Sequence, residues 1–343
     1  MSIGSEAVGG MVGLDNRLSI AANYRRFARL EAAGRSPAYQ RLAEFVATSD
    51  VLLGFLAGMP ADKRQPNLLF AAARHLLGVP AEAETLVELV AAHSTVLAEV
   101  MRTRRTQTNE AARCACLLPA LAQLPSPLAL LEVGASAGLT LLPDRYSYDY
   151  DGHRIPGRDP QAPTLTCHLS GPAPLPQHTP SVVWRAGLDL NPLDVSNDAD
   201  LDWLASLIWP GEQGRVDRLY AAAATTRRTP PQLHRGDLLD DLAQVAAGAP
   251  HEATLVVYHT AVLAYVEPAK RAAFADAVRQ LDAVWLSNEA PGVIADANAE
   301  HTVDERDAGD RDGGFVLVRN GLEQLARTDP HGTWLDWTAT PTG

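Results

Sequence analysis

From about residue 127 onward, short apolar runs alternate with helical patterns, and this alternation constrains the fold more than any other feature of the chain. Each run is rich in Val, Leu and Ala, leads into Gly, Asp or Asn, and is followed by apolar residues at three- and four-residue spacing. Such a pattern is typical of a parallel sheet with crossover helices. We therefore predict an α/β fold with strands within residues 129–133, 181–187, 231–236, 253–259 and 283–289.

Two further apolar runs, at residues 314–321 and 332–337, lie too close together for a crossover helix. They predict an antiparallel hairpin at the edge of the sheet. The stretch from Asp144 to Thr179 is rich in Pro, Gly, Tyr and His, and it is too long for a simple connection. We expect a substrate-binding element or a linker there, with the run TLTCHL as a candidate for an additional strand.

The N-terminal part of the chain has a different texture. From about residue 18 to residue 124 the apolar residues recur at helical spacing, with breaks at Gly78 and Pro80. This pattern predicts an N-terminal helical cap domain over residues 1–126. The α/β domain then covers residues 127–343, with an insertion at about 144–180.

The composition excludes several classes of function. Acidic residues outnumber basic ones by 41 to 29, and no Lys/Arg-rich run contains aromatic residues, so we expect no nucleic-acid partner. The three cysteines contain no C-x-x-C pair, which argues against a disulfide framework and against a zinc site, and we expect no bound metal. Neither a signal peptide nor an apolar run of ~20 residues is present, so we expect a cytoplasmic protein without membrane contact. The oligomeric state stays open, a homodimer included.

The segment LLEVGASAG ends the first predicted strand and can be read in two ways. Gly134, Ser136 and Gly138 fit the G-x-S-x-G pattern of a hydrolase nucleophile elbow, for which Asp237 and His259 follow in the required order. An elbow normally follows several strands, however, and here the preceding residues have helical patterns. A serine hydrolase using Ser136 therefore stays as an alternative to a glycine-rich cofactor loop.

The same segment resembles the first motif of class I S-adenosylmethionine-dependent methyltransferases. AGLDLNPLD and LHRGDLLDDL resemble the ends of that family's second and third strands, and the agreement extends over about residues 127–337. More narrowly, TQTNEAARCACLLPAL together with LLEVGASAGLTLLPDRYSYDY resembles a bacterial family known as domain of unknown function 2332 (DUF2332), over nearly the whole chain. The resemblance implies a Rossmann-like methyltransferase sheet.

The resemblance also implies S-adenosylmethionine as the cofactor. Its binding residues would be Glu132, Gly134, Ser136, Gly138, Asp189 and Asp237. Asp189 would accept the ribose hydroxyls, Asp237 would lie beside the adenine amino group, and Glu132 would lie near the methionine amino group. The two glycines would let the backbone approach the ligand, because they lack a Cβ.

The remaining candidate residues concern the substrate. His259 follows an apolar strand and is a candidate general base, with Tyr258 beside it to orient a substrate. Substrate-binding candidates are Gln107, Asn109, Glu110, Arg145 and Tyr265. The implied function is methyl transfer to a small-molecule acceptor. The alternatives are a lyase, decarboxylase or cyclase that uses the same cofactor, and a catalytically inactive ligand-binding or interaction protein.

Overall fold

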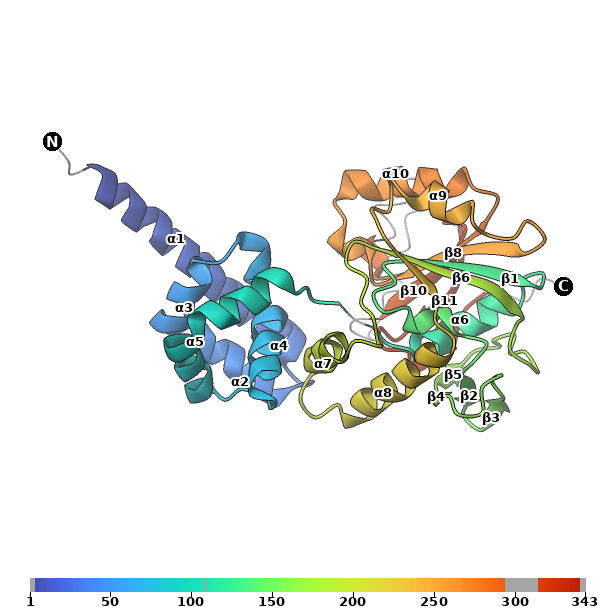
Figure 1. Cartoon of the computed structure of the whole chain (residues 1–343), viewed down its shortest axis with the longest axis horizontal. Coiled ribbons are helices and arrows are strands. Elements are labelled where there is room, and N and C mark those ends of the chain that lie inside the picture. Colours follow the sequence, from blue (N-terminus) through green and yellow to red (C-terminus); the bar gives the residue numbers. More distant parts are fainter. Residues whose placement is uncertain (1–3, 108, 294–313, 340–343) are drawn as a thin grey trace. The chain divides into compact units, whose positions relative to one another are not determined.

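The computed structural model describes residues 4–107, 109–293 and 314–339, with side chains from residue 16 onward (Figure 1). The chain forms two compact units, each built from two segments. The first unit contains the residues up to 108 together with Asp198–Val216, and the second contains Asn109–Asn197 together with Asp217–Gly343. The expected boundary at residue 126 therefore differs from the observed one at residue 108.

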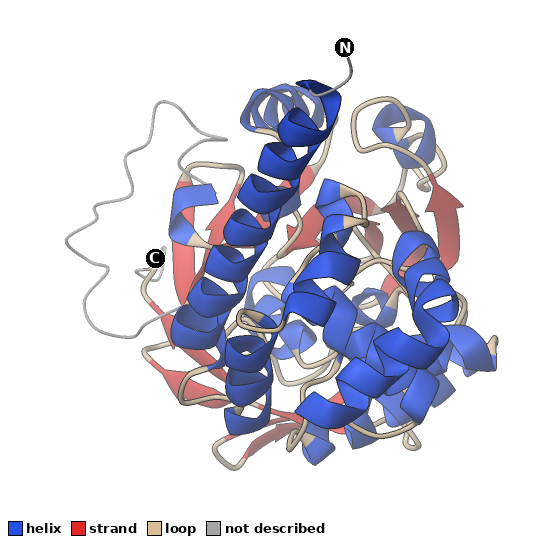
Figure 2. Cartoon of the chain, turned by 90° about the vertical axis from the view of Figure 1, so that its left-hand side faces the viewer, coloured by secondary structure: helices blue, strands red, loops and turns tan. Residues whose placement is uncertain are grey.

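The described residues of the first unit form helices joined by turns (Figure 2). Its helices are α1 (Gly4–Phe27), a π-helical turn (Ala28–Ala32), α2 (Pro37–Val46), α3 (Asp50–Ala57), a 3-10 turn (Ala61–Lys63), α4 (Pro66–Leu77), α5 (Ala83–Thr103) and α7 (Asp198–Leu207). The Ser36 hydroxyl accepts a hydrogen bond from the Tyr39 amide and so caps the start of α2. Trp209, from the second segment, packs on the rings of Phe27 and Tyr39, with centroids 5.6 and 5.7 Å away. Aromatic packing therefore joins the two segments of this unit.

The second unit contains a nine-stranded sheet with the order β5-β12-β11-β10-β9-β8-β1-β6-β7. The five strands from β7 to β9 in this order are mutually parallel, which confirms the predicted α/β class with a mostly parallel sheet. The strands are β1 (Leu128–Val133), β5 (His168–Ser170), β6 (Val182–Asp189), β7 (Gln232–Arg235), β8 (Thr254–Thr260), β9 (Val284–Glu289), β10 (Phe315–Arg319), β11 (Glu323–Thr328) and β12 (Trp334–Trp337).

The expected C-terminal hairpin is wrong in its pairing. β10 and β12 are not partners, because β11 lies between them and pairs antiparallel with both. The signal for this extra strand was the Asn320-Gly321 pair, whose φ angles of 54° and 70° suit a tight hairpin turn. The edge beside β12 is occupied by β5, which comes from the insertion.

Helices α9 (Leu242–Ala246) and α10 (Pro268–Arg279) cover one face of the parallel strands, and α6 (Arg113–Leu121) packs beside β12 of the main sheet. On the covered face, Leu131 and Val257 pack with Phe274 of α10 and with residues of α9. α6 packs against β12 and against β4 of the insertion, and all its residues are buried. This complete burial explains why α6 belongs to the sheet unit. α8 (Gln213–Arg228) precedes β7.

The insertion forms a second sheet of three strands, with β2 (Ser147–Tyr150) between β3 (His153–Ile155) and β4 (Thr164–Thr166). Tyr146, Tyr148 and Tyr150 are all buried, and their hydroxyls donate to the backbone oxygens of Leu139, Pro143 and Ala115. The three tyrosines alternate with partly buried residues, so they lie on the one buried face of this segment. TLTCHL forms two short strands, β4 and β5, which belong to different sheets.

Candidate functional site

The strand order of the main sheet reverses beside β1. The chain passes from β1 to its neighbour β6 on one side, and later enters β8 on the other side. Open α/β sheets bind ligands at such a switch point, outside the carboxyl ends of the strands. Here that position contains the turn from Gly134 to Gly138 after β1 and Asp189 at the end of β6.

The two glycines of the turn have backbone angles that favour glycine. Gly134 and Gly138 have φ values of 72° and 70°, in the left-handed region. A Cβ on Gly134 would lie 2.3 Å from Cγ2 of Val262, and a Cβ on Gly138 would lie 2.8 Å from Cγ of Pro231. The positive φ angles and the nearby side chains of Val262 and Pro231 therefore require glycine at both positions.

Asp189 joins the glycine-rich turn to the end of β6. Its Oδ2 accepts a hydrogen bond of 2.8 Å from the Ser136 amide, and its Oδ1 accepts one of 2.7 Å from the Asn191 amide. The side chain is partly exposed. Two motifs that lie more than 50 residues apart in the sequence are thus in direct contact at the carboxyl edge of the sheet.

Asp237 lies at the same edge, after the next strand. The Gly236 amide donates to the backbone oxygen of Asp189 over 3.0 Å, so Asp237 follows directly after a contact with the end of β6. Its Oδ1 accepts a hydrogen bond from the Leu239 amide, and its Oδ2 lies 3.8 Å from Nζ of Lys270. Asp189 and Asp237 therefore follow one another on neighbouring strands along the carboxyl edge of the sheet, in the expected order.

Glu132 lies on β1 beneath the turn and is almost completely buried. Its Oε1 accepts a hydrogen bond from the Thr140 hydroxyl, whereas its Oε2 has no hydrogen-bond partner among the described residues. Burial, together with the nearby charge of Asp189, raises the pKa of this carboxyl from 4.5 to about 8, against the opposing effects of Thr140 and Arg113. Glu132 is therefore mostly protonated at neutral pH.

Two residues other than glycine have positive φ angles at this edge. They are Ser136, with φ of 50°, in the turn after β1, and Ala261, with φ of 58°, directly after β8. The Ser136 hydroxyl oxygen is also buried without a hydrogen-bond partner in the described part of the chain. Such backbone angles are unfavourable for residues with a Cβ and concentrate at functional sites.

The structure does not support His259 as a general base. The ring is completely buried, its Nδ1 lies 2.8 Å from Oε1 of Glu289, and its Nε2 accepts a hydrogen bond of 3.1 Å from Nε1 of Trp285. Because the indole nitrogen of Trp285 can only donate, Nε2 of His259 accepts and Nδ1 is the nitrogen that donates to Glu289. Both nitrogens are thus committed to protein partners on the α10 side of the sheet.

Tyr258, the neighbour of His259 on β8, is also buried and donates its hydroxyl to the backbone oxygen of Thr140 over 3.0 Å. Burial raises the pKa of this phenol well above 10, and the charge of Glu132 raises it further. Its predicted role in orienting a substrate is therefore not supported, because the hydroxyl fixes the loop after β1.

Glu289 is a functional candidate that the sequence did not indicate. Its Oε1 accepts hydrogen bonds from His259 Nδ1 and from the amides of Val262 and Leu263, at 2.8, 2.8 and 3.1 Å. Val262 in turn packs against Gly134. The carboxylate at the end of β9 thus holds the loop after β8 against the turn after β1. The position of Glu289 at the end of a predicted strand was the sequence feature that could have indicated this role.

Asn109 and Glu110 contact the protein rather than an open site. Asn109 Nδ2 donates to the Ala135 oxygen over 3.1 Å, and Oδ1 accepts from the Leu139 amide over 3.2 Å, so this side chain bridges the glycine-rich turn. Glu110 is buried, and its Oε1 lies 2.6 Å from Nε of Arg218. Gln107 belongs to the other unit.

Arg113, four residues after Asn109, was not predicted either. Its side chain is buried, and Nη1 donates to both the backbone oxygen and the hydroxyl of Thr260, at 3.0 and 3.1 Å. Nε donates to the Pro330 oxygen. Asn109 and Arg113 therefore secure the loops after β1 and β8, and the four-residue spacing of these two side chains was the signal.

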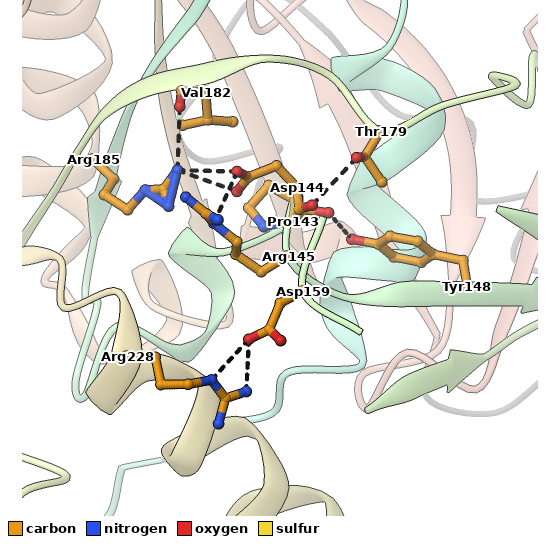
Figure 3. Close-up of polar contacts among 9 residues, drawn as sticks. All are labelled: Pro143, Asp144, Arg145, Tyr148, Asp159, Thr179, Val182, Arg185 and Arg228. Carbon is orange, nitrogen blue, oxygen red and sulfur yellow. Dashed lines mark hydrogen bonds and ion pairs between the residues drawn. The ribbon is translucent and has the colours of Figure 1, made fainter. Parts of the chain in front are cut away.

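Arg145 anchors the insertion. Its Nε lies 3.3 Å from Oδ2 of the buried Asp144, which also pairs with Arg185 of β6 (Figure 3). Burial raises the pKa of Asp144, and the two arginines oppose that rise. A second ion pair, Arg228 with Asp159, lies nearby in the same view. Tyr265, the remaining substrate candidate, is 75% exposed.

The proposed hydrolase triad is not assembled. The nitrogens of His259 contact Glu289 and Trp285, and the carboxylate of Asp237 contacts Leu239 and Lys270.

Among the described residues, no group of three or more His, Cys, Asp or Glu side chains could hold a metal ion. In the same residues, no helix is long and apolar enough to cross a membrane.

Comparison with known proteins identifies the family. The family model described as "Uncharacterized protein conserved in bacteria (DUF2332)" matches residues 21–337, so the chain belongs to this family, as its sequence had indicated. A search of curated proteins gives no significant match. Among solved structures, the chain is similar to a possible exported protein from Bordetella parapertussis, with 14% identity and a TM-score of 0.27, over 80% of this chain and 71% of that one.

Proposed function

We propose that this member of the DUF2332 family binds S-adenosylmethionine at the carboxyl edge of its main sheet and transfers the methyl group to a small molecule. The observation that carries the proposal is the hydrogen bond from the Ser136 amide to Asp189, which joins the glycine-rich turn to an acidic strand end at the switch point. Asp237 follows on the next strand, in the order that the cofactor would require.

The chemistry of these carboxylates suits a nucleoside. A carboxylate offers about four lone-pair positions, and the two amide hydrogen bonds of Asp189 occupy one on each oxygen. The remaining positions can accept the two ribose hydroxyls. Asp237 has one oxygen engaged by an amide, and its other oxygen, 3.8 Å from Nζ of Lys270, keeps a lone pair that can accept from the adenine amino group. Glu132 lies below the turn, where a cationic amino group would favour its ionised form.

In this proposal the protein mainly positions its ligands. The cofactor supplies an electrophilic methyl group on a sulfonium, and alignment of two bound reactants can contribute roughly 7–11 kcal/mol to lowering a barrier. The ends of β6 and β7 hold the nucleoside, while Asn109 and Glu289 fix the two loops beside it. His259 and Tyr258 have no role in proton transfer, so the favoured acceptor is a group that is already nucleophilic without deprotonation.

Calorimetric titration with S-adenosylmethionine and with its demethylated product tests the proposal. We expect saturable binding, and we expect Asp189→Asn and Asp237→Asn each to weaken it at least tenfold. Asp276→Asn is the matched control, because that carboxylate is 75% exposed and pairs only locally with Arg279. Circular dichroism establishes that each variant is folded.

Absence of binding at about 1 mM ligand, a concentration that reveals even weak complexes, would refute the cofactor. Unchanged affinity in a folded Asp189→Asn variant would refute the assignment of the site. Binding without methyl transfer to any acceptor would favour the alternatives in which the cofactor serves a different reaction or acts only as a ligand.

A further inference from the structure

Cys116 and Cys167 come from distant parts of the chain and are both buried in the sheet unit. Cys116 lies in α6, and its thiol donates to the backbone oxygen of Trp334 over 3.6 Å. Cys167 is the single residue between β4 and β5, and its amide donates to the Asp149 oxygen over 3.0 Å. Neither residue belongs to the candidate site described above.

Two separate sets of contacts bring these cysteines together. On one side, β12 pairs with β5 so that Trp334 lies opposite His168, the residue after Cys167, while Trp334 also accepts from Cys116. On the other side, Tyr150 donates its hydroxyl to the oxygen of Ala115, and the preceding residue in β2 holds the Cys167 amide. The helix and the β4–β5 junction are thus fixed against each other at this point.

The two side chains meet directly. The Cys167 side chain lies within hydrogen-bonding distance of the Cys116 thiol, and this contact, together with burial, raises the pKa of Cys116 well above 9. Cys114, two residues earlier, points elsewhere, because its thiol donates to the Thr140 oxygen over 3.3 Å. The lack of a C-x-x-C pair had argued against a disulfide framework, whereas the structure separates the three cysteines into one pair and one single thiol.

We propose that Cys116 and Cys167 form an intramolecular disulfide when the protein meets a small disulfide oxidant such as oxidised glutathione. One thiol loses its proton and attacks the oxidant, which releases one glutathione thiol and leaves a mixed disulfide. The second protein thiol then displaces the other glutathione. Two protein thiols are oxidised and one glutathione disulfide is reduced to two thiols, so the exchange balances.

The bond would tie α6 to the insertion across a closed loop of about 50 residues, a length at which a cross-link restricts the unfolded chain strongly. Because both thiols are buried, the oxidant reaches them slowly in the folded protein. The bond should therefore form faster when the reduced chain folds in the presence of the oxidant than when the folded protein is treated.

The test is to refold the reduced full-length chain in buffers with increasing ratios of oxidised to reduced glutathione, and to map the disulfides by mass spectrometry without reduction. Tryptic cleavage after Arg113, Arg145, Arg158 and Arg185 places Cys114 and Cys116 in one peptide and Cys167 in another. We expect these two peptides to be linked in the wild type and in Cys114→Ser, and the link to be absent in Cys116→Ser and Cys167→Ser.

Two results would overturn the proposal. One is a folded wild-type protein that keeps all three thiols free at the most oxidising ratio. The other is a link that disappears in Cys114→Ser and persists in Cys116→Ser. Circular dichroism of each refolded sample distinguishes a missing link from a failure to fold, and iodoacetamide labelling of Cys114 after denaturation provides an internal control within the same peptide.

Discussion

Replacement of Glu132 by Gln gives the sharpest test of how the candidate site is built. The carboxyl is almost completely buried on β1, with Oε1 bonded to Thr140 and Oε2 without a hydrogen-bond partner in the described residues. Gln has the shape of the protonated acid and keeps an oxygen that can accept from Thr140. It is neutral at every pH, so the variant removes the titration while preserving the packing.

The expected effect follows from the pKa of this group. Burial raises it from 4.5 to about 8, so the folded protein retains a proton that the unfolded chain releases between these pH values. Stability therefore falls as the pH rises through this range. One pKa unit corresponds to about 1.4 kcal/mol, so the total loss is roughly 5 kcal/mol, of which roughly 3 kcal/mol falls between about pH 6 and pH 9.

Urea unfolding followed by circular dichroism at these two pH values measures the effect. We expect the wild type to lose roughly 3 kcal/mol more than Glu132→Gln between about pH 6 and pH 9. Glu252→Gln is the control, because this side chain is exposed and its replacement should leave the pH dependence unchanged. Equal pH dependence in the wild type and in Glu132→Gln would show that the carboxyl is ionised in the folded protein, and would refute the argument.

Three further predictions concern the loops at the carboxyl edge. Gly134→Ala should lower the free energy of unfolding by at least ~2 kcal/mol, because the residue has a positive φ and the new Cβ would overlap Val262. Adding Val262→Ala should recover only the part of this loss that comes from the overlap. An additive double-mutant cycle would show that the two positions are not in contact. Glu289→Gln should lower the free energy of unfolding by roughly 2–4 kcal/mol, because His259 and two amides lose a charged acceptor, and a chemical-denaturation curve that matches the wild type would contradict this. A fluorophosphonate probe should leave Ser136 unlabelled; labelling that Ser136→Ala abolishes would establish the hydrolase alternative.

The sequence was sufficient to predict the parallel strands and the order of Asp189 and Asp237, because strand patterns and strand-end carboxylates are local features. It was insufficient for β11, since EQLART lacks the strict alternation of a half-buried strand and its turn was overlooked. The sequence also could not predict which face of the sheet His259 lies on. Successive residues of a strand point to opposite faces, and only the packing of the helices decides which face is covered.

The role of the segment before β1 depended on contacts that sequence spacing alone does not reveal. Asn109 was expected to bind a substrate and instead bridges the turn after β1, and Arg113, for which no role was predicted, holds the end of β8. No full helix follows β1, where a single 3-10 turn at Leu139–Leu141 is present. The side chain of Asn109, in the segment before α6, instead bridges the turn after β1.

The short strand β5 has a consequence for any attempt to shorten the chain. It is one of the two edge strands of the main sheet and comes from the insertion, and its residues His168, Leu169 and Ser170 pair with β12. Without it, the backbone groups of Trp334–Trp337 would form an unprotected sheet edge flanked by two tryptophans, a template for pairing with another chain. A truncated protein lacking residues 144–180 should therefore be prone to self-association, so the insertion helps to keep neighbouring molecules apart as well as completing the fold.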